Sequence, residues 1–203
     1  GYSPESTNIA LATAMIFVVT GIDEPEEFFE ALGDGMIWLL LAAFIIAAAV
    51  KESGLSARFT LAVTRRARSV SHLFYSLTVV MILTALFIPS TSGRAALMIP
   101  IFLALSKAIA DQRINRALAL LFPSVILQSA VGSLIGAGAH LLTADILWRM
   151  GGERIGFLRW MILGMPLAAV SSFVTTWLIL HLFLRQQERQ RPLHLQLIHD
   201  VIP

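Results

Sequence analysis

The charged residues of this chain are confined to short clusters that separate long apolar runs. Of its 203 residues, 57% are hydrophobic and only 14% are charged, whereas a water-soluble domain carries about 25% charged residues. A soluble protein also distributes its charges along each element, so this segregation is typical of a chain whose solvent is lipid. The sequence therefore predicts an all-α integral membrane protein. The absence of cysteine excludes disulfides and thiolate metal sites.

Four apolar segments are predicted to span the bilayer as helices, each of which needs roughly 20 residues. The first is shorter than this, so we expect its first turn in the headgroup region. The four segments are residues 9–22, 36–50, 117–147 and 161–184. We expect residues 1–184 to form one membrane domain and residues 185–203 a basic cytoplasmic tail.

Basic clusters indicate the orientation of the chain. Residues 56–68 mix arginines with apolar residues, in a pattern that favours an amphipathic helix in the membrane interface over a basic loop. By the positive-inside rule this segment and the tail lie in the cytoplasm, and the acidic loop 23–35 lies outside. The predicted location is a bacterial inner membrane, and the predicted partner is the lipid bilayer and not a nucleic acid.

The stretch "FIPSTSGRAALMIP", residues 87–100, places polar residues between two apolar arms. The arms are residues 73–89 and 95–106, and their outer flanks are both expected in the cytoplasm. Two arrangements fit: two crossing helices with the polar turn outside, or a re-entrant hairpin with the polar turn at its tip. The second arm has about 12 residues, too few for a full crossing at about 1.5 Å per residue, which favours the hairpin.

A second interruption lies within residues 117–147. Gly132, Gly136 and Gly138 each lower helix propensity by about 1 kcal/mol relative to alanine. Non-helical backbone persists in a membrane only where it is packed in protein or lines a wet cavity. Transporters use such breaks to coordinate Na⁺ with carbonyl and hydroxyl oxygens and to attract anions to helix N-termini. Two interruptions in one small chain therefore favour a transport function.

Ionisable residues beside the two interruptions have functional and structural interpretations. Arg94 follows the polar turn directly, and an arginine in the membrane costs at least ~2.5 kcal/mol. Its guanidinium is suited to a bidentate contact with an anionic substrate. The alternatives are an ion pair with Asp145 and an interfacial anchor. His140 and Asp145 end the broken span. They are either accessory groups in a proton relay or, the interpretation we favour, helix caps or residues of the headgroup zone.

Four stretches in sequence order resemble one half of a divalent anion/sodium symporter, the family of sodium-coupled dicarboxylate, citrate and sulfate carriers. The likeness covers most of residues 16–184. Residues 21–63, beginning "GIDEPEEFF", resemble the early spans and a cytoplasmic amphipathic helix. The stretch "FIPSTSGRAALMIPIFLAL" resembles the re-entrant hairpin, "SAVGSLIGAGAH" the glycine-rich break, and "GFLRWMILGMPLAAV" the start of the last helix.

The resemblance implies site residues. Ser90, Thr91 and Ser92 match the Ser-Asn-Thr tip that shares Na⁺ and substrate-carboxylate binding in the family, although Thr91 stands where asparagine is usual. Gly132 and Ser133 match the broken span, where a backbone carbonyl completes a sodium site. The implied cofactor is Na⁺, and the implied substrate is a small anion of the dicarboxylate or sulfate type.

The family has two inverted repeats, and the sequence resembles one of them. The resemblance therefore implies half of a sodium-coupled secondary transporter, not an enzyme, that works as a homo-oligomer or with a second membrane chain supplying the other repeat. The competing interpretation is a non-transporting subunit of a larger membrane complex. The short chain favours the subunit, and the costly polar tip with Arg94 favours the transporter.

Overall fold

The computed structural model describes residues 4–22, 25–26, 30, 33, 35–54 and 67–193. Their regular structure is helical except for one isolated bridge between Ser69 and Pro192, which confirms the all-α prediction. The chain divides into two units, residues 1–42 and 43–203. The two N-terminal apolar runs form α1 (Pro4–Val19) and α3 (Gly35–Glu52), and α3 crosses the boundary between the units. The predicted amphipathic helix, apart from residues 67–68, and most of the acidic loop lie outside the described residues.

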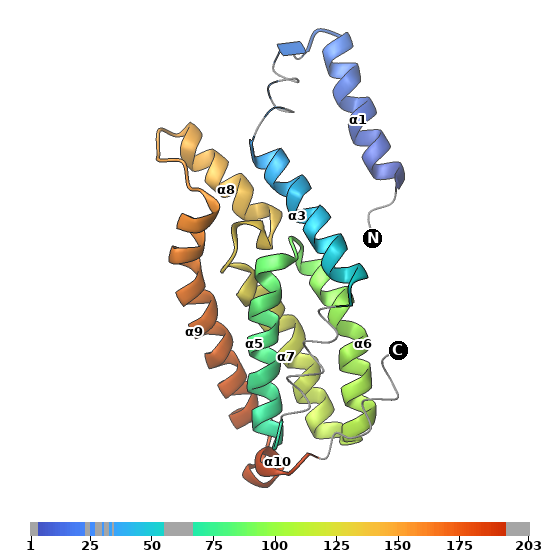
Figure 1. Cartoon of the computed structure of the whole chain (residues 1–203), viewed down its shortest axis with the longest axis vertical. Helices are drawn as coiled ribbons and strands as arrows, with labels where there is room; N and C mark the ends of the chain where they lie inside the picture. Colours follow the sequence, from blue (N-terminus) through green and yellow to red (C-terminus); the bar gives the residue numbers. More distant parts are fainter. Residues whose placement is uncertain are drawn as a thin grey trace. The chain divides into compact units, whose positions relative to one another are not determined.

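The second unit is a helical bundle in which α7 packs against three other helices: α5, α6 and α9 (Figure 1). Helix α5 also packs against α9. The elements of this bundle are α5 (Val70–Phe87), α6 (Thr91–Ile109), α7 (Gln112–Ala130), the 3₁₀ turn η1 (Leu134–Gly136), α8 (Gly138–Arg149), α9 (Phe157–Phe183) and α10 (Gln186–Gln190).

The buried core of the bundle is centred on α5 and α7. The core contains fully buried side chains from α5 and α7, such as Phe74, Leu77 and Leu121. In contrast, α9 exposes large apolar side chains along its outer face, including Ile162 and Leu167. Three helices of the described residues, α5, α6 and α9, are long and apolar enough to cross a membrane. An apolar surface of this extent is stable only in lipid or against another protein, and the chain is an integral membrane protein.

Hydroxyl residues of α9 join it to its neighbours. Thr176 bonds to Thr78 of α5 with 2.6 Å between the hydroxyl oxygens, and the Thr175 hydroxyl donates to the Gln128 side chain of α7 at 2.9 Å. Small hydroxyl residues allow close helix packing in membranes and hydrogen-bond across the contact. The run 171–176 therefore has a packing role.

The second arm of the hairpin is longer than the sequence predicted. We expected about 12 residues (95–106), but α6 has 19 and begins at Thr91, inside the polar turn. The Ser90 side chain caps the helix by accepting from the Gly93 amide, so the polar residues form the first turn of α6 instead of preceding it. The length of this arm consequently does not favour a re-entrant hairpin over a crossing helix.

The predicted break is present, and it lies along the side of α9. The Trp160 indole bonds to the Val131 carbonyl, and Gly132 lies against Met165 and Ala168. At about 1.5 Å per residue, Ala168 lies about 16 Å from the start of α9, and the whole helix is about 40 Å long. Helix α8 continues the chain for about 18 Å past the break. Helix thus flanks the break on both sides in the chain, α7 before it and α8 after it.

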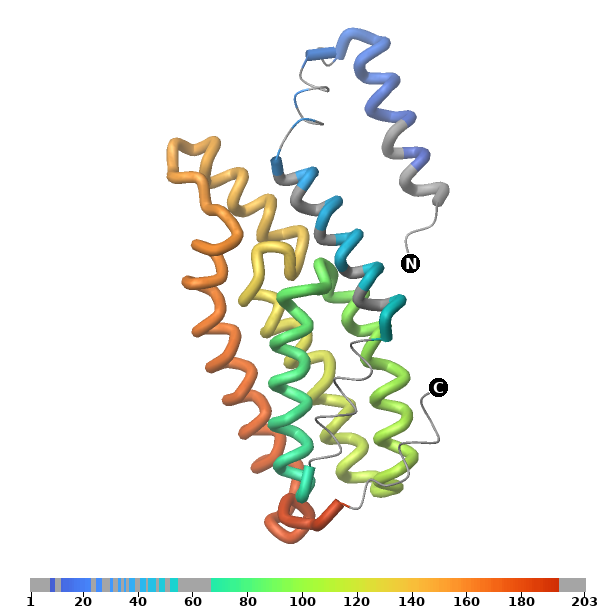
Figure 2. Tube along the Cα trace, viewed as in Figure 1, coloured from blue at the N-terminus to red at the C-terminus, as the bar shows by residue number. Residues whose placement is uncertain are grey.

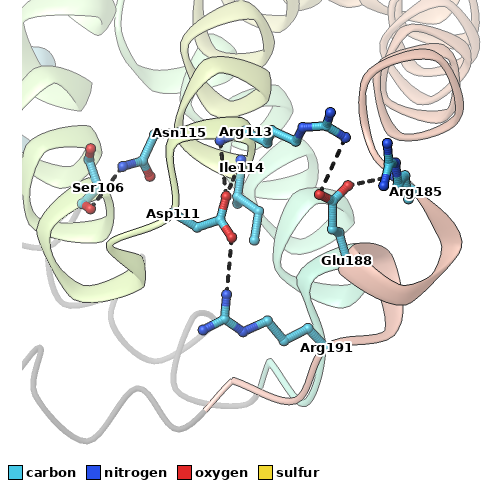
Figure 3. Close-up of polar contacts among 8 residues, drawn as sticks. All are labelled: Ser106, Asp111, Arg113, Ile114, Asn115, Arg185, Glu188 and Arg191. Carbon is cyan, nitrogen blue, oxygen red and sulfur yellow. Dashed lines mark hydrogen bonds and ion pairs between the residues drawn. The ribbon is translucent and has the colours of Figure 1, made fainter.

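The first residues of the predicted tail are bound to the bundle (Figure 3). Arg191 pairs with Asp111 at 3.1 Å, and Glu188 pairs with Arg113 at 3.6 Å. Asp111 also caps α7 by accepting from the Arg113 and Ile114 amides. The Val70 amide donates to the Arg191 carbonyl at 3.3 Å. Residues 185–191 therefore hold the start of α5 and the start of α7 together.

Candidate functional site

The hairpin tip is formed by the residues that end α5 and begin α6. Pro89 has no amide proton and cannot continue α5, and Ser90 has the extended backbone of a helix cap (φ −165°, ψ 126°). The Ser90 hydroxyl accepts from the Gly93 amide at 3.1 Å and lies 3.0 Å from the Ser92 hydroxyl. Ser92 is exposed, whereas Ser90 and Thr91 are half-buried. The predicted hydroxyl group is therefore assembled and partly open.

The helix break is tightly packed around glycines. Gly132, Ser133 and Gly136 are all buried. A Cβ added to Gly136 would lie 2.3 Å from the Ala130 carbonyl oxygen, and one added to Gly164 of α9 would lie 2.4 Å from the Val131 carbonyl oxygen. Any other residue at position 136 or 164 would displace the backbone of the break. The glycines are needed for close approach as well as for ending α7.

Two aromatic side chains bond to carbonyls that the break leaves free. The Trp160 indole Nε1 donates to the Val131 carbonyl at 2.9 Å. The His140 Nδ1 lies 3.0 Å from the Ser133 carbonyl oxygen, so this nitrogen carries the proton. The two rings stack with centroids 5.1 Å apart. His140 thus bonds to the broken backbone, whereas the N-cap position of α8 is Ala137 and Asp145 lies inside that helix.

The structure brings the tip and the break to the same region of the bundle. Helix α5, which leads into the tip, contacts η1 of the break. Figures 1 and 2 both show the α5–α6 turn beside the segment between α7 and α8. The sequence-predicted residues 90–92 and 132–133 therefore belong to neighbouring structures, although about 40 residues of chain separate them.

The Arg94 side chain joins the hairpin to α7, the helix that leads into the break. Its side chain is fully buried. The Nη1 atom donates to the Ser129 hydroxyl at 2.9 Å and to the Met81 carbonyl at 3.2 Å, and Nη2 donates to the Ile126 carbonyl. The Nε atom is buried and has no partner. A direct contact between Arg94 and a substrate stays a prediction, and in this arrangement protein oxygens occupy its terminal nitrogens.

The two structural alternatives for Arg94, an ion pair with Asp145 and an interfacial anchor, both disagree with the structure. Asp145 pairs with Arg149 on the same helix at 2.8 Å, so it is not the partner of Arg94. An interfacial anchor would expose the guanidinium, which is instead fully buried. Sequence reasoning did not find Ser129, Trp160 or Gly164. Their only signal was their position in the sequence. Ser129 lies within about one helical turn of Gly132, and Trp160 and Gly164 lie within about one and a half turns of Met165, which packs against Gly132.

The oxygen-rich character of the region limits which ions it could hold. Among the described residues, no group of three or more His, Asp or Glu side chains could bind a metal ion. The available ligands at the tip and the break are hydroxyl and backbone carbonyl oxygens, which suit hard cations. The Ser133 hydroxyl is buried without a hydrogen-bond partner, so it is free to coordinate.

Comparison with known proteins agrees with the membrane architecture and its two interruptions. A family model described as citrate transporter matches residues 5–198. The chain belongs to this citrate transporter family. The match confirms the resemblance to the carriers of dicarboxylates and citrate, and the family is one of transporters and not of enzymes.

Two relatives illustrate the range of similarity. A membrane protein of Cupriavidus necator is 32% identical over 146 residues, which cover 70% of this chain and 28% of the relative. The sodium-dependent dicarboxylate transporter SdcS of Staphylococcus aureus is 27% identical over 168 residues, covering 77% of this chain and 32% of the relative. The chain therefore spans less than a third of the length of these curated relatives. No solved structure matches it.

Proposed function

We propose that this chain forms one repeat of a secondary transporter for small carboxylate anions of the citrate or dicarboxylate type. The substrate binds between the hydroxyl tip, residues 90–92, and the break, residues 132–138. The observation that carries this proposal is the juxtaposition of the two interruptions inside one bundle. Sheltered non-helical backbone is what a membrane protein uses to bind polar solutes.

Two helix N-termini in this region favour anions. Helix α6 begins at Thr91 beside the exposed Ser92, and α8 begins at Gly138, where Ala137 provides no side-chain cap. Each N-terminus has unpaired amides and the equivalent of about half a positive charge. A substrate with two or more carboxylates can interact with both. This chemistry fits the dicarboxylate that the staphylococcal relative is named for.

Sodium coupling is part of the proposal. We assign the ion to the hydroxyls of Ser90 and Thr91 together with oxygens of Gly132 and Ser133. The unpartnered Ser133 hydroxyl supports this assignment, as does the name of the relative SdcS. His140 hydrogen-bonds to the Ser133 carbonyl, so we assign it an accessory role beside the ion.

Alternating access needs a second repeat. Inverted-repeat transporters bind their substrates at the interface between repeats, and this chain covers less than a third of its curated relatives. The second repeat comes from another copy, another membrane chain, or a further part of a longer protein. We place the assembly in the bacterial inner membrane, with residues 185–193 on the cytoplasmic side.

The test is uptake of radiolabelled citrate and succinate into liposomes that contain the protein purified from its native membrane. We expect uptake driven by a Na⁺ gradient, and a large loss in Ser90→Ala. Ser171→Ala is the matched control, because its hydroxyl bonds only to the Ala168 carbonyl of its own helix. If uptake is absent and the chain co-purifies in fixed ratio with a larger complex, the chain is a non-transporting subunit.

A further inference from the structure

Arg94 carries a buried positive charge with no negative partner. None of the ion pairs among the described residues includes it, and its side chain is fully buried. An unpaired buried charge is strongly disfavoured unless other polar groups surround it. The only groups that do so here are three oxygens, of Met81, Ile126 and Ser129.

These oxygens lie within hydrogen-bonding distance of one another, a spacing that the ligands of a hard cation also have. The Ser129 hydroxyl oxygen lies 3.3 Å from the Ile126 carbonyl oxygen and 3.5 Å from the Met81 carbonyl oxygen. Ligand oxygens at about 2.4 Å from a hard cation and at right angles to one another lie about 3.4 Å apart. Two carbonyls and one hydroxyl, from two different helices, thus form part of a coordination shell around the guanidinium.

Helix electrostatics also favour a cation at this position. Ile126 and Ser129 lie in the last turn of α7, which ends at Ala130. A helix C-terminus carries the equivalent of about half a negative charge. The field of α7 therefore stabilises the guanidinium, and it would stabilise any other cation that occupied the same place.

We propose that Arg94 is a tethered cation that permanently fills an oxygen site between the hairpin and the broken helix, in place of a bound metal ion. Its side chain starts in the first turn of α6 and ends on oxygens of α5 and α7, so it fastens both arms of the hairpin to the helix that leads into the break. The guanidinium itself lies beside Met81 of α5 and Ile126 of α7, away from the hydroxyl tip along these helices. This proposal concerns the junction itself and holds whichever anion the protein binds.

The test measures cation-dependent thermal stability of the purified full chain. Tm is recorded by tryptophan fluorescence as NaCl replaces choline chloride up to 300 mM at constant ionic strength. In Arg94→Ala the three oxygens lose their cation, so we expect Na⁺ to raise Tm by about 3 °C more than in the wild type. Adding Ser129→Ala to this variant removes one ligand and should abolish the extra response.

Controls separate this effect from general ones. Arg116 is exposed and makes no hydrogen bond or ion pair with the described residues, so Arg116→Ala should respond to Na⁺ as the wild type does. An Arg94→Ala protein without an extra Na⁺ response overturns the proposal. If Arg94→Ala does not fold, Arg94→Lys and Arg94→Met decide: lysine should preserve the fold, and a methionine variant as stable as the lysine one without Na⁺ overturns the proposal. The readout of this test is thermal stability and not citrate uptake, so a failure of the transport proposal would leave its outcome unchanged.

Discussion

The hairpin tip and the helix break are both interruptions of apolar spans, but they treat their polar groups differently. At the tip, the Ser90 and Ser92 hydroxyls bond to each other and to one amide, and Ser92 is exposed. At the break, the backbone is buried, and Trp160 and His140 donate to the carbonyls of Val131 and Ser133. The tip is open, whereas side chains of the protein close the break.

This difference assigns the two regions different tasks. An anion can reach the tip without displacing any protein group, because the exposed hydroxyl and the α6 N-terminus are already available. The Ser133 carbonyl already accepts a hydrogen bond from His140, so a ligand there must share this oxygen. The tip is therefore the half of the proposed site that can bind an anion without rearrangement. The break is the half whose polar groups stabilise the bundle when no ligand is bound.

The largest effect is expected at the most tightly packed point of the break. Gly136→Ala places a Cβ 2.3 Å from a backbone oxygen that cannot rotate away. We expect a loss of about 3 kcal/mol in the free energy of unfolding, as for severe overpacking of a core, measured by urea or thermal unfolding in detergent.

The matched control for this change is Gly138→Ala. An added Cβ at Gly138 meets nothing within 4 Å, so its effect should stay within about 0.5 kcal/mol. Equal stability of the two variants would show that the break is as open as the tip, and the contrast between the two regions would be lost.

A smaller effect is expected from uncapping the break. Trp160→Phe keeps a ring that can stack on His140 but removes the donor to the Val131 carbonyl. Leaving this carbonyl unpaired should cost about 2 kcal/mol. In Trp177→Phe the loss should be well under half of this, since the Trp177 ring is half exposed and its indole has no acceptor among the described residues. Thermal unfolding of both variants measures the difference.

The sequence predicted the features that depend on local composition. The apolar runs became helices, and the glycines at 132, 136 and 138 ended α7 where expected. Local rules also explain the error at α6. The second arm was expected to begin at its first apolar residue, Ala95, with the polar residues before it in a turn, whereas residues 91–94 form the first turn of α6 and Ser90 caps it. A cap signal is a stronger guide to a helix start than the first apolar residue.

The contacts of Arg94 and of the tail were not predictable in this way. Arginine was expected to seek a carboxylate or a substrate, because composition shows charges but not the backbone carbonyls that a broken bundle presents. Likewise, "RQQERQR" has the composition of a solvated tail, yet Glu188 and Arg191 bind the start of α7. Both outcomes depend on which helix ends the tertiary fold brings together.

The smallest effect is expected at the tip, where stability and binding should separate. Ser90→Ala removes the cap on the Gly93 amide and should cost about 1 kcal/mol. Ser92→Ala removes only an exposed hydroxyl whose partner is Ser90, so its stability should change by less than about 0.5 kcal/mol. If the tip is the open half of the site, Ser92→Ala must nevertheless weaken citrate binding, which calorimetry on the purified protein measures. Unchanged citrate affinity in Ser92→Ala would mean that the exposed face of the tip does not contact the anion, and the division between a binding tip and a closed break would have to be abandoned.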